Sequence, residues 1–347
     1  MVFLFFHYPE PKERGEMAEK LRIAQMGLGP IGNKVTQYLA ERPSLEIVGA
    51  IDTDPAKVGQ DVGVLAGLAP LGVTVTADID AVLGGGRADV VVLTTASSLA
   101  KVHDQLLRIL PYGVSVVSSC EELSYPWQTQ PELAASIDRA AKKSNAAVLA
   151  TGVNPGFLMD FLPAAMTGVC RKVRKVTVER IQDATFRRIP FQKKIGAGLT
   201  VEEFYKKVEE GTLRHVGLTE SMHLIAARLG WQLDKTEDII TPIIAERRVT
   251  TDSMVIEPGN VLGVQQLGRG VMGGEEVISL IFRAAIGEPG ARDRIVIDGE
   301  PAIDSCINGG VNGDVATCAI LVNAIPVVAK ARPGLRTMAD IEPITCW

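Results

Sequence analysis

Residues 21–32, LRIAQMGLGPIG, decide the fold of the first half of this chain. A short apolar run ends in glycines spaced G-x-G-x-x-G, and a helix pattern follows directly. Gly27 permits a tight turn, Gly29 lets the backbone approach a pyrophosphate, and Gly32 lets the helix pack on the strand. The helix N-terminus presents free N–H groups to phosphate oxygens. We expect this turn to contact a dinucleotide through Gly27, Gly29, Pro30, Ile31 and Gly32.

An acidic residue supports this prediction. Asp52 ends the apolar strand pattern at 45–51 and lies about 20 residues after Gly32, as expected of the carboxylate that binds ribose hydroxyls. A carboxylate here favours NAD, because it repels the 2′-phosphate of NADP. Thr53 could hydrogen-bond such a phosphate, however, and Lys57 could reach it. The predicted cofactor is therefore NAD(P)H, with both forms left open.

Strand and helix patterns alternate in the first half and then change. The strands are expected at 45–51, 88–94, 114–117 and 146–150, with helices at 98–110 and 131–143. Such alternation is typical of parallel βαβ units. After about residue 155 we expect helices at 158–169, 201–210 and 219–229, strands at 173–180, 239–245, 261–267, 277–284 and 294–297, and a helix at 315–331. Few helices separate the late strands, which indicates antiparallel pairing.

The predicted fold class is α/β, a Rossmann doubly wound parallel sheet with a second α+β domain built on a mostly antiparallel sheet. The expected parts are a loose N-terminal extension at 1–18, the Rossmann domain at 19–155, a substrate and dimerisation domain at 156–305, and a C-terminal helix returning to the Rossmann domain at 306–347.

Composition argues against several classes of partner. The net charge is −5 and no long basic run occurs, so nucleic acid is not an expected partner. No segment approaches the roughly 20 apolar residues of a membrane span. The five cysteines form no C-x-x-C pair and share no ligand spacing with the four histidines, so we expect no metal and a reducing, cytoplasmic location.

The ends of two later strands are expected near the cofactor, because ligands lie beyond the carboxyl ends of strands in open α/β sheets. These residues are Thr94, Thr95 and Ala96 after one strand and Ser118, Ser119 and Cys120 after the next. Glu121 and Glu122 follow at once. From the pattern alone they are either a proton-transfer group beside the nicotinamide or surface acids at a helix start.

A set of motifs resembles the 2,4-diaminopentanoate dehydrogenases and the related native amine dehydrogenases, within the wider dihydrodipicolinate-reductase-like superfamily. The motifs run in order along residues 20–345: Gly27–Gly32, Ser119–Glu122, Tyr125–Trp127, Asn154–Gly156, Gln192–Gly198, Asn308–Gly310, Gly313–Thr317, Val322–Pro326 and Pro333–Leu335. The resemblance implies a homodimer that interconverts a small amine with a ketone or aldehyde plus ammonia, using NAD(P)H. It also implies that one glutamate of the Cys-Glu-Glu segment is catalytic. Its spacing to Asn154 favours Glu122, with Glu121 as the second choice.

The resemblance places the substrate pocket as well. Asn154 and Pro155 would lie beside the nicotinamide, and Phe157 and Met159 would form apolar walls. Arg180 and Gln182 lie on the strand that enters the second domain. Arg180 would either anchor a substrate carboxylate through a bidentate contact or be a solvated charge.

Other residues are left open or set aside. His215 and His223 are more typical of satisfied histidines than of a pocket face, and the basic residues between 187 and 194 are expected to be solvated. The histidine-rich segment usual in dihydrodipicolinate reductases is not found. Two alternatives remain: a reductase of a cyclic imine, which needs no ammonia, and a nucleotide-sensing protein without turnover.

Overall fold

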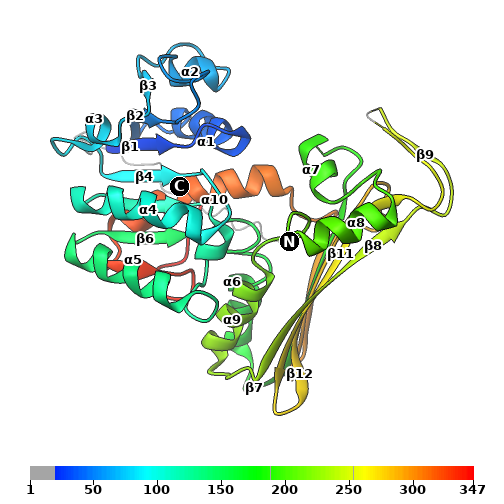
Figure 1. Cartoon of the computed structure of the whole chain (residues 1–347). Helices are drawn as coiled ribbons and strands as arrows, with labels where there is room; N and C mark the ends of the chain where they lie inside the picture. Colours follow the sequence, from blue (N-terminus) through cyan, green and yellow to red (C-terminus); the bar gives the residue numbers. More distant parts are fainter. Residues whose placement is uncertain (1–19, 188, 253) are drawn as a thin grey trace, which may run out of the picture.

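The computed structural model describes residues 20–187, 189–252 and 254–347. The expected N-terminal extension at 1–18 lies outside the described residues. The described chain forms two lobes, each built on one main sheet (Figure 1). Within the described ranges, no helix combines the length and the mean hydropathy that crossing a bilayer requires.

The first lobe is a parallel sheet of seven strands in the order β15-β6-β5-β4-β1-β2-β3. Its strands are β1 (Leu21–Met26), β2 (Leu45–Ile51), β3 (Val75–Thr76), β4 (Val90–Leu93), β5 (Ser115–Ser118), β6 (Ala147–Ala150) and β15 (Gly334–Arg336). Its helices are α1 (Pro30–Ala40), α2 (Val62–Leu65), α3 (Ile79–Leu83), α4 (Leu99–Ile109), α5 (Pro131–Lys143) and α10 (Gly313–Ala329), with short 3₁₀ turns η1 (Leu110–Tyr112) and η2 (Glu121–Leu123).

Helices cover both faces of this sheet, which explains its apolar strands. Along β4, Val90 and Val92 pack with α1 and α10, whereas Val91 and Leu93 pack with α4 and α5 on the other face. Both sides of each central strand therefore lose their exposure to water, and a continuous apolar run is favoured over an alternating one. The predicted doubly wound sheet is confirmed.

The second lobe is a six-stranded sheet in the order β14-β13-β7-β12-β11-β8. Its strands are β7 (Lys172–Asp183), β8 (Lys235–Ile244), β11 (Val261–Met272), β12 (Glu275–Ala285), β13 (Arg292–Glu300) and β14 (Ile303–Asn308), and a hairpin of β9 (Val249–Thr250) and β10 (Val255–Ile256) adjoins them. Only the β7–β12 pair is parallel among these six strands of the described chain, so the mostly antiparallel sheet is confirmed.

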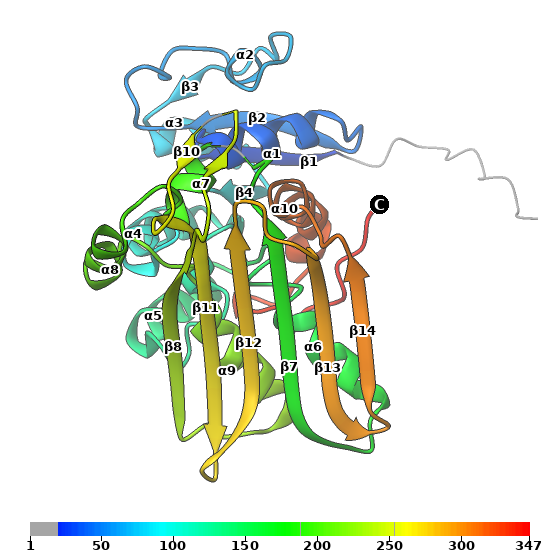
Figure 2. The same cartoon turned by 90° about the vertical axis from the view of Figure 1, so that its right-hand side faces the viewer.

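One face of the second sheet is covered and the other is open. The helices of this lobe are α6 (Phe161–Met166), η3 (Thr167–Val169), α7 (Ile189–Lys194), α8 (Val201–Glu209) and α9 (Leu218–Leu229). Figure 2 shows α6 and α9 behind the strands, with the front of the sheet uncovered. Burial alternates along the middle of β7, where Val176 and Val178 are buried and Thr177 and Glu179 are partly exposed.

Several elements differ from the sequence prediction. The helix expected at 158–169 is shorter, because Asp160 caps α6 by accepting the N–H of Phe161 at 2.7 Å. Strand β14 extends the second sheet to Asn308, past the expected limit at 305. The short elements α2, α3, α7, β3, β9, β10 and β15 carry too few residues to show a clear periodicity.

Candidate active site

Two glycines of the first turn, Gly27 and Gly32, occupy places that no other residue fills easily. Gly27 has φ +90°, and a Cβ there would lie 2.8 Å from the carbonyl oxygen of Thr94. A Cβ on Gly32 would lie 1.8 Å from the carbonyl oxygen of Gly27, so the helix packs on the turn only with glycine. A Cβ on Gly29 would meet no atom within 4 Å, because this residue faces open space at the N-terminus of α1. This cradle fits a dinucleotide pyrophosphate.

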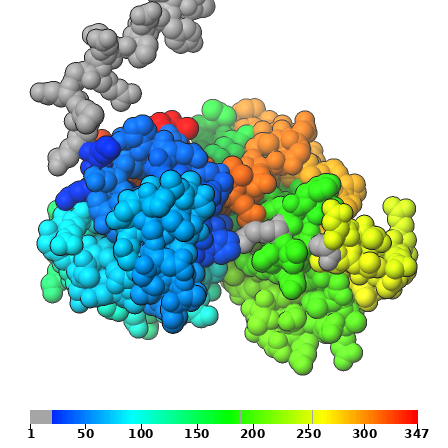
Figure 3. All heavy atoms as spheres, turned by 90° about the horizontal axis from the view of Figure 1, so that it is seen from above, coloured from blue at the N-terminus to red at the C-terminus, as the bar shows by residue number. Residues whose placement is uncertain are grey.

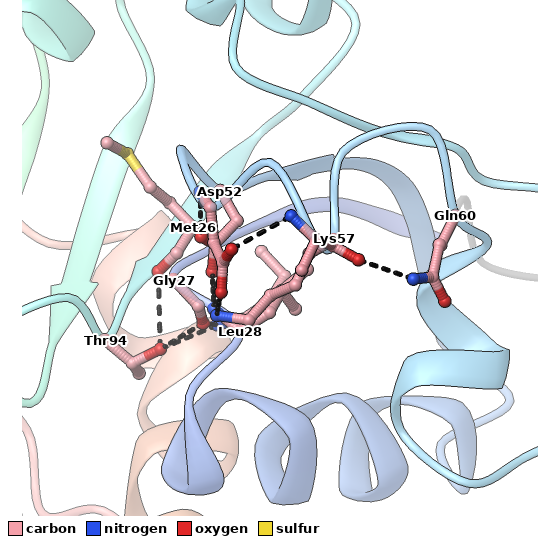
Figure 4. A network of polar contacts seen from close by, with 10 residues as sticks. Met26, Gly27, Leu28, Asp52, Lys57, Gln60 and Thr94 are labelled. Carbon is pink, nitrogen blue, oxygen red and sulfur yellow. Dashed lines mark hydrogen bonds and ion pairs between the residues drawn. The ribbon is translucent and has the colours of Figure 1, made fainter.

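Asp52 lies at the end of β2 and fixes the same turn (Figure 4). Its carboxylate accepts the N–H of Leu28 at 2.7 Å and that of Asp54 at 2.9 Å, and Lys57 Nζ lies 3.1 Å away. Burial alone would raise the pKa of Asp52, but these hydrogen bonds and the Lys57 charge hold it below its usual range. Thr53 is exposed beside them. The anion suits ribose hydroxyls, while Lys57 offsets the charge that would repel a 2′-phosphate.

Some of the residues that follow β4 and β5 line a cleft between the two lobes, and others only support the residues that line it. Thr94 lies in the cleft but also holds the glycine turn, because its hydroxyl donates to the carbonyl of Gly27 at 2.8 Å. Thr95, Ala96 and Ser119 line the cleft too. Ser118 and Cys120 do not: both are buried, Ser118 accepts the Cys120 N–H at 3.1 Å, and the Cys120 thiol faces the carbonyl of Ser97. Their expected contact with the cofactor is therefore replaced by a supporting role.

A cleft of about 390 Å³ lies between the two lobes, beyond the carboxyl ends of β4, β5 and β6. Figure 3 shows the two lobes from above, the first in blue and cyan and the second in green, yellow and orange. The first lobe contributes Gly29, Pro30, Ile31, Thr94, Thr95, Ala96, Ser97, Ser119, Glu121, Val153 and Asn154, and α10 adds Gly313, Asp314 and Thr317. The second lobe contributes Arg180, Gln182, Arg187, Phe191, Lys194, His215 and Phe282.

The two glutamates of η2 have different environments, and the preference for Glu122 needs correction. Glu122 Oε2 accepts the backbone N–H of Leu99 at 2.8 Å and the side-chain amide of Gln130 at 3.0 Å. It thus caps the start of α4, where a carboxylate is favoured by the free N–H groups and the helix dipole. Glu121 lines the cleft instead, and its carboxylate has no ion pair or hydrogen bond within the described ranges. The candidate acid–base residue is therefore Glu121.

The predicted substrate residues are only partly brought together. Asn154 lines the cleft and Pro155 lines a small cavity beside it. Met159 is fully buried in the core of the second lobe, and Phe157 packs against that core and against the Phe161 ring at 6.0 Å. Phe157 and Met159 are therefore core residues and not pocket walls. The phenylalanines that line the cleft are instead Phe191 and Phe282.

Arg180 lines the cleft, but its guanidinium already has protein partners. Nη1 donates to Asp293 at 2.6 Å in a pair that is almost fully buried, and Nη2 donates to the carbonyl of Val311 at 2.9 Å. Burial lowers the pKa of Arg180, and Asp293 counteracts this. A bidentate contact from Arg180 to a substrate carboxylate would compete with both partners, so this expectation is corrected. Gln182 is also bound, donating to Val311 and accepting from Arg187 at 3.0 Å.

Sequence reasoning missed or undervalued several cleft residues. Arg187 was expected to be solvated, yet it pairs with Asp314 at 3.1 Å and lies over the Phe191 ring at 4.1 Å. His215 stacks on Phe282 with ring centroids 4.4 Å apart. Burial, and then nearby positive charges, lower the pKa of His215 to about 3, so its ring is neutral. These residues come from separate elements, and no local spacing links them.

Lys194 differs from the two arginines of the cleft, which are both paired with acids. It ends α7 at the rim of the cleft, and in the part of the chain that the structure describes it makes no ion pair. Arg180 and Arg187 are neutralised by Asp293 and Asp314. The cleft therefore holds one unpaired negative group, Glu121, on the first lobe and one unpaired positive group, Lys194, on the second, counted over the described residues.

This chain resembles known dehydrogenases and reductases over most of its length. Residues 157–347 match the 2,4-diaminopentanoate dehydrogenase C-terminal domain family, and residues 21–120 match the dihydrodipicolinate reductase N-terminus family. The 2,4-diaminopentanoate dehydrogenase of Acetoanaerobium sticklandii is 35% identical, covering 93% of this chain and 94% of the relative. An amine dehydrogenase of Streptomyces virginiae is 26% identical, covering 91% and 94%.

A solved structure agrees. The amine dehydrogenase from Mycobacterium smegmatis superposes with a TM-score of 0.83 at 28% identity, covering 94% of this chain and 97% of that chain. The identity to the Acetoanaerobium sticklandii relative extends over nearly both full lengths, and a family model covers more than half of the chain. The chain therefore belongs to the 2,4-diaminopentanoate dehydrogenase family.

Proposed function

We propose that this chain is an NAD(P)H-dependent amine dehydrogenase that interconverts a small primary amine with the matching ketone or aldehyde and ammonia. In the reductive direction the carbonyl compound, ammonium, NAD(P)H and a proton give the alkylammonium product, NAD(P)+ and water. The observation that carries the proposal is the Glu121 carboxylate, which lies unpaired among the described residues in a cleft that also holds the N-terminus of α1.

The residues of the first lobe have complementary tasks. The glycine turn and the N-terminus of α1 would hold the pyrophosphate, and Asp52 with Lys57 would hold the adenosine ribose. When bound, NAD(P)H supplies the hydride. Glu121 would take a proton from ammonium, and its negative charge would stabilise the iminium cation that accepts the hydride. Neutral His215 would form an uncharged wall.

The charge pattern of the cleft favours a substrate with two charged ends. Glu121 suits a cationic nitrogen, and Lys194, on the opposite lobe, suits a carboxylate. Phe191 and Phe282 provide apolar surface in the same cleft. We therefore infer an amino acid as the amine substrate and a carbonyl compound with a carboxylate as its partner. A simple alkyl amine, held by the aromatic rings, is the second candidate.

We infer a homodimer formed through the open face of the second sheet. Ile239, Leu267 and Ile281 lie in register across β8, β11 and β12; Ile239 is exposed, and the other two are partly exposed. Such an apolar stripe on an uncovered sheet supports contact with a second copy. The mass in solution by light scattering after size exclusion tests this, and a single-chain mass would refute it. Within the described residues the five cysteines form no disulfide, which supports a cytoplasmic location, since a reducing compartment keeps thiols reduced.

The experiment measures NADH and NADPH consumption by the native enzyme in alkaline buffer, with and without ammonium. The carbonyl panel pairs alkyl ketones with carbonyl compounds of similar length that carry a carboxylate. We expect consumption only with ammonium, and the higher kcat/KM with the carboxylate-bearing compounds. Consumption that needs no ammonium would instead indicate a carbonyl or cyclic imine reductase, and binding of the cofactor without any turnover would indicate a nucleotide sensor.

A further inference from the structure

A second, much smaller cavity adjoins the cleft beside Glu121. Its volume is about 40 Å³, and it lies among the residues that follow β5 and β6 and the first turns of α10. Glu121, Asn154 and Thr317 line both spaces, so the small cavity borders the cleft directly. Thr151, at the carboxyl end of β6, lines only the small cavity.

Two of the residues that line this cavity carry a buried oxygen atom without a hydrogen-bond partner among the described residues. Thr151 is 4% exposed and Asn154 is 8% exposed, yet Thr151 Oγ1 and Asn154 Oδ1 make no hydrogen bond within the described ranges. The Asn154 amide nitrogen contacts Met159 Sδ at 3.0 Å, which leaves the amide oxygen as the group still available. Buried polar atoms are nearly always satisfied, so these two oxygens indicate a small molecule that donates hydrogen bonds.

The cavity selects by size and charge. A volume of about 40 Å³ admits a molecule as small as water or ammonia. The available groups are a carboxylate, an amide oxygen and a hydroxyl, and together they favour a cation with several N–H donors. Thr317 Oγ1 already accepts the N–H of Val153 at 3.2 Å. Ammonium is small, positively charged and rich in N–H donors, whereas a substituted amine needs more room.

We propose that this cavity is the ammonium subsite of the enzyme, with Thr151, Asn154 and Glu121 as its acceptors. This inference rests on the proposed amine dehydrogenase function. Glu121 takes one proton from the bound ammonium, and the freed lone pair forms the C–N bond with the carbonyl carbon in the cleft. The carbonyl oxygen leaves as water after receiving that proton and one from the nitrogen, so carbonyl plus ammonium gives iminium plus water.

The test measures the KM for ammonium, the KM for the carbonyl substrate and kcat in three variants. Thr151→Val removes the hydroxyl at nearly constant volume, Thr151→Ser keeps it, and Thr167→Val makes the same change outside both cavities. We expect Thr151→Val to raise the ammonium KM about tenfold or more, with little change in the carbonyl KM. Thr151→Ser recovers most of that loss and, because it lacks the methyl group, also raises the preference for methylamine relative to ammonium.

The outcomes separate this inference from the function on which it rests. Native turnover that depends on ammonium, with the same ammonium KM in Thr151→Val as in Thr167→Val, would show that the cavity holds only a water molecule. Equal increases in both KM values would show a structural role for Thr151 and would also overturn the subsite. Native turnover without any need for ammonium would overturn the proposed function itself. Fluorescence titration with NADH in each variant confirms that the fold and the cofactor site are retained.

Discussion

At the scale of single residues, Glu121 and Glu122 form a natural pair for comparison. Glu121→Gln removes the only cleft carboxylate of η2 while keeping its shape. We expect kcat to fall about 10²- to 10⁴-fold, the range that general acid–base groups contribute. The fluorescence-detected affinity for NADH should remain within about twofold, since Glu121 is not part of the glycine cradle.

Glu122→Gln is the matched control for that prediction. Glu122 caps α4 through Leu99 and Gln130, so its loss should lower the free energy of unfolding by about 1 kcal/mol and spare most of kcat. Urea denaturation and initial rates measure the two effects. A large loss of kcat in Glu122→Gln with an active Glu121→Gln would contradict the assignment and restore the choice made from sequence.

The same pair shows the limit of sequence reasoning at this scale. The sequence places both carboxylates after β5, because strand order and motif spacing are local properties. Which of them faces the cleft depends on the N–H of Leu99, which lies 23 residues away along the chain. Likewise, Arg180 cannot be recognised as a paired residue without Asp293, 113 positions later. Long-range partners decide the role of each side chain, and one sequence does not reveal them.

At the scale of elements, the first turn of α9 contains a buried acid that makes stability depend on pH. Glu220 is 3% exposed, and its Oε2 has no hydrogen-bond partner within the described ranges. Burial is the largest cause that raises the pKa of Glu220 to about 7, and the charge of Glu122 adds to it. Because the folded pKa lies above the unfolded value, the stabilising contribution is complete below about pH 4.5 and is lost as pH rises through 7.

Glu220→Gln should remove this dependence. Between pH 5 and pH 8 the native protein should lose about 2 to 3 kcal/mol of unfolding free energy through this group, whereas the variant should not. Urea denaturation of both proteins at several pH values measures the difference. Glu202→Gln, on the exposed first turn of α8, is the control and should keep the native slope. If the free energy of unfolding changes with pH in the same way in the native protein and in Glu220→Gln, then Glu220 is ionised at every pH measured.

Elements also differ in how well the sequence predicts them. The long strands of the second sheet, such as β11 and β12, were expected at the right places but too short, because their ends depend on cross-strand pairing. The edge strand β15 has three residues and gains its strand character only from β6. Helix α10 was predicted closely, since it is apolar on all sides and must be buried between α1 and the first sheet.

At the scale of the whole molecule, the cleft exists only where the two lobes meet. Glu121 comes from the first lobe and Lys194 from α7 of the second, so neither half of the sequence shows that both charges line one cleft. The sequence predicted both sheets and their order along the chain. It did not predict the charge balance of the cleft, which depends on the neutralisation of Arg180 by Asp293 and of Arg187 by Asp314.

The preference among carbonyl substrates tests the charge balance of the cleft directly. Lys194→Met keeps the length of the side chain and removes its charge, so the KM for a carboxylate-bearing carbonyl compound should rise about tenfold or more. The KM for an uncharged ketone of similar length should change little, because no anion then faces Lys194. Lys193→Met is the control, since the neighbouring lysine is exposed and does not line the cleft. Equal effects of Lys194→Met on both carbonyl compounds would mean that α7 only shapes the cleft, and an uncharged amine held by Phe191 and Phe282 would become the better substrate.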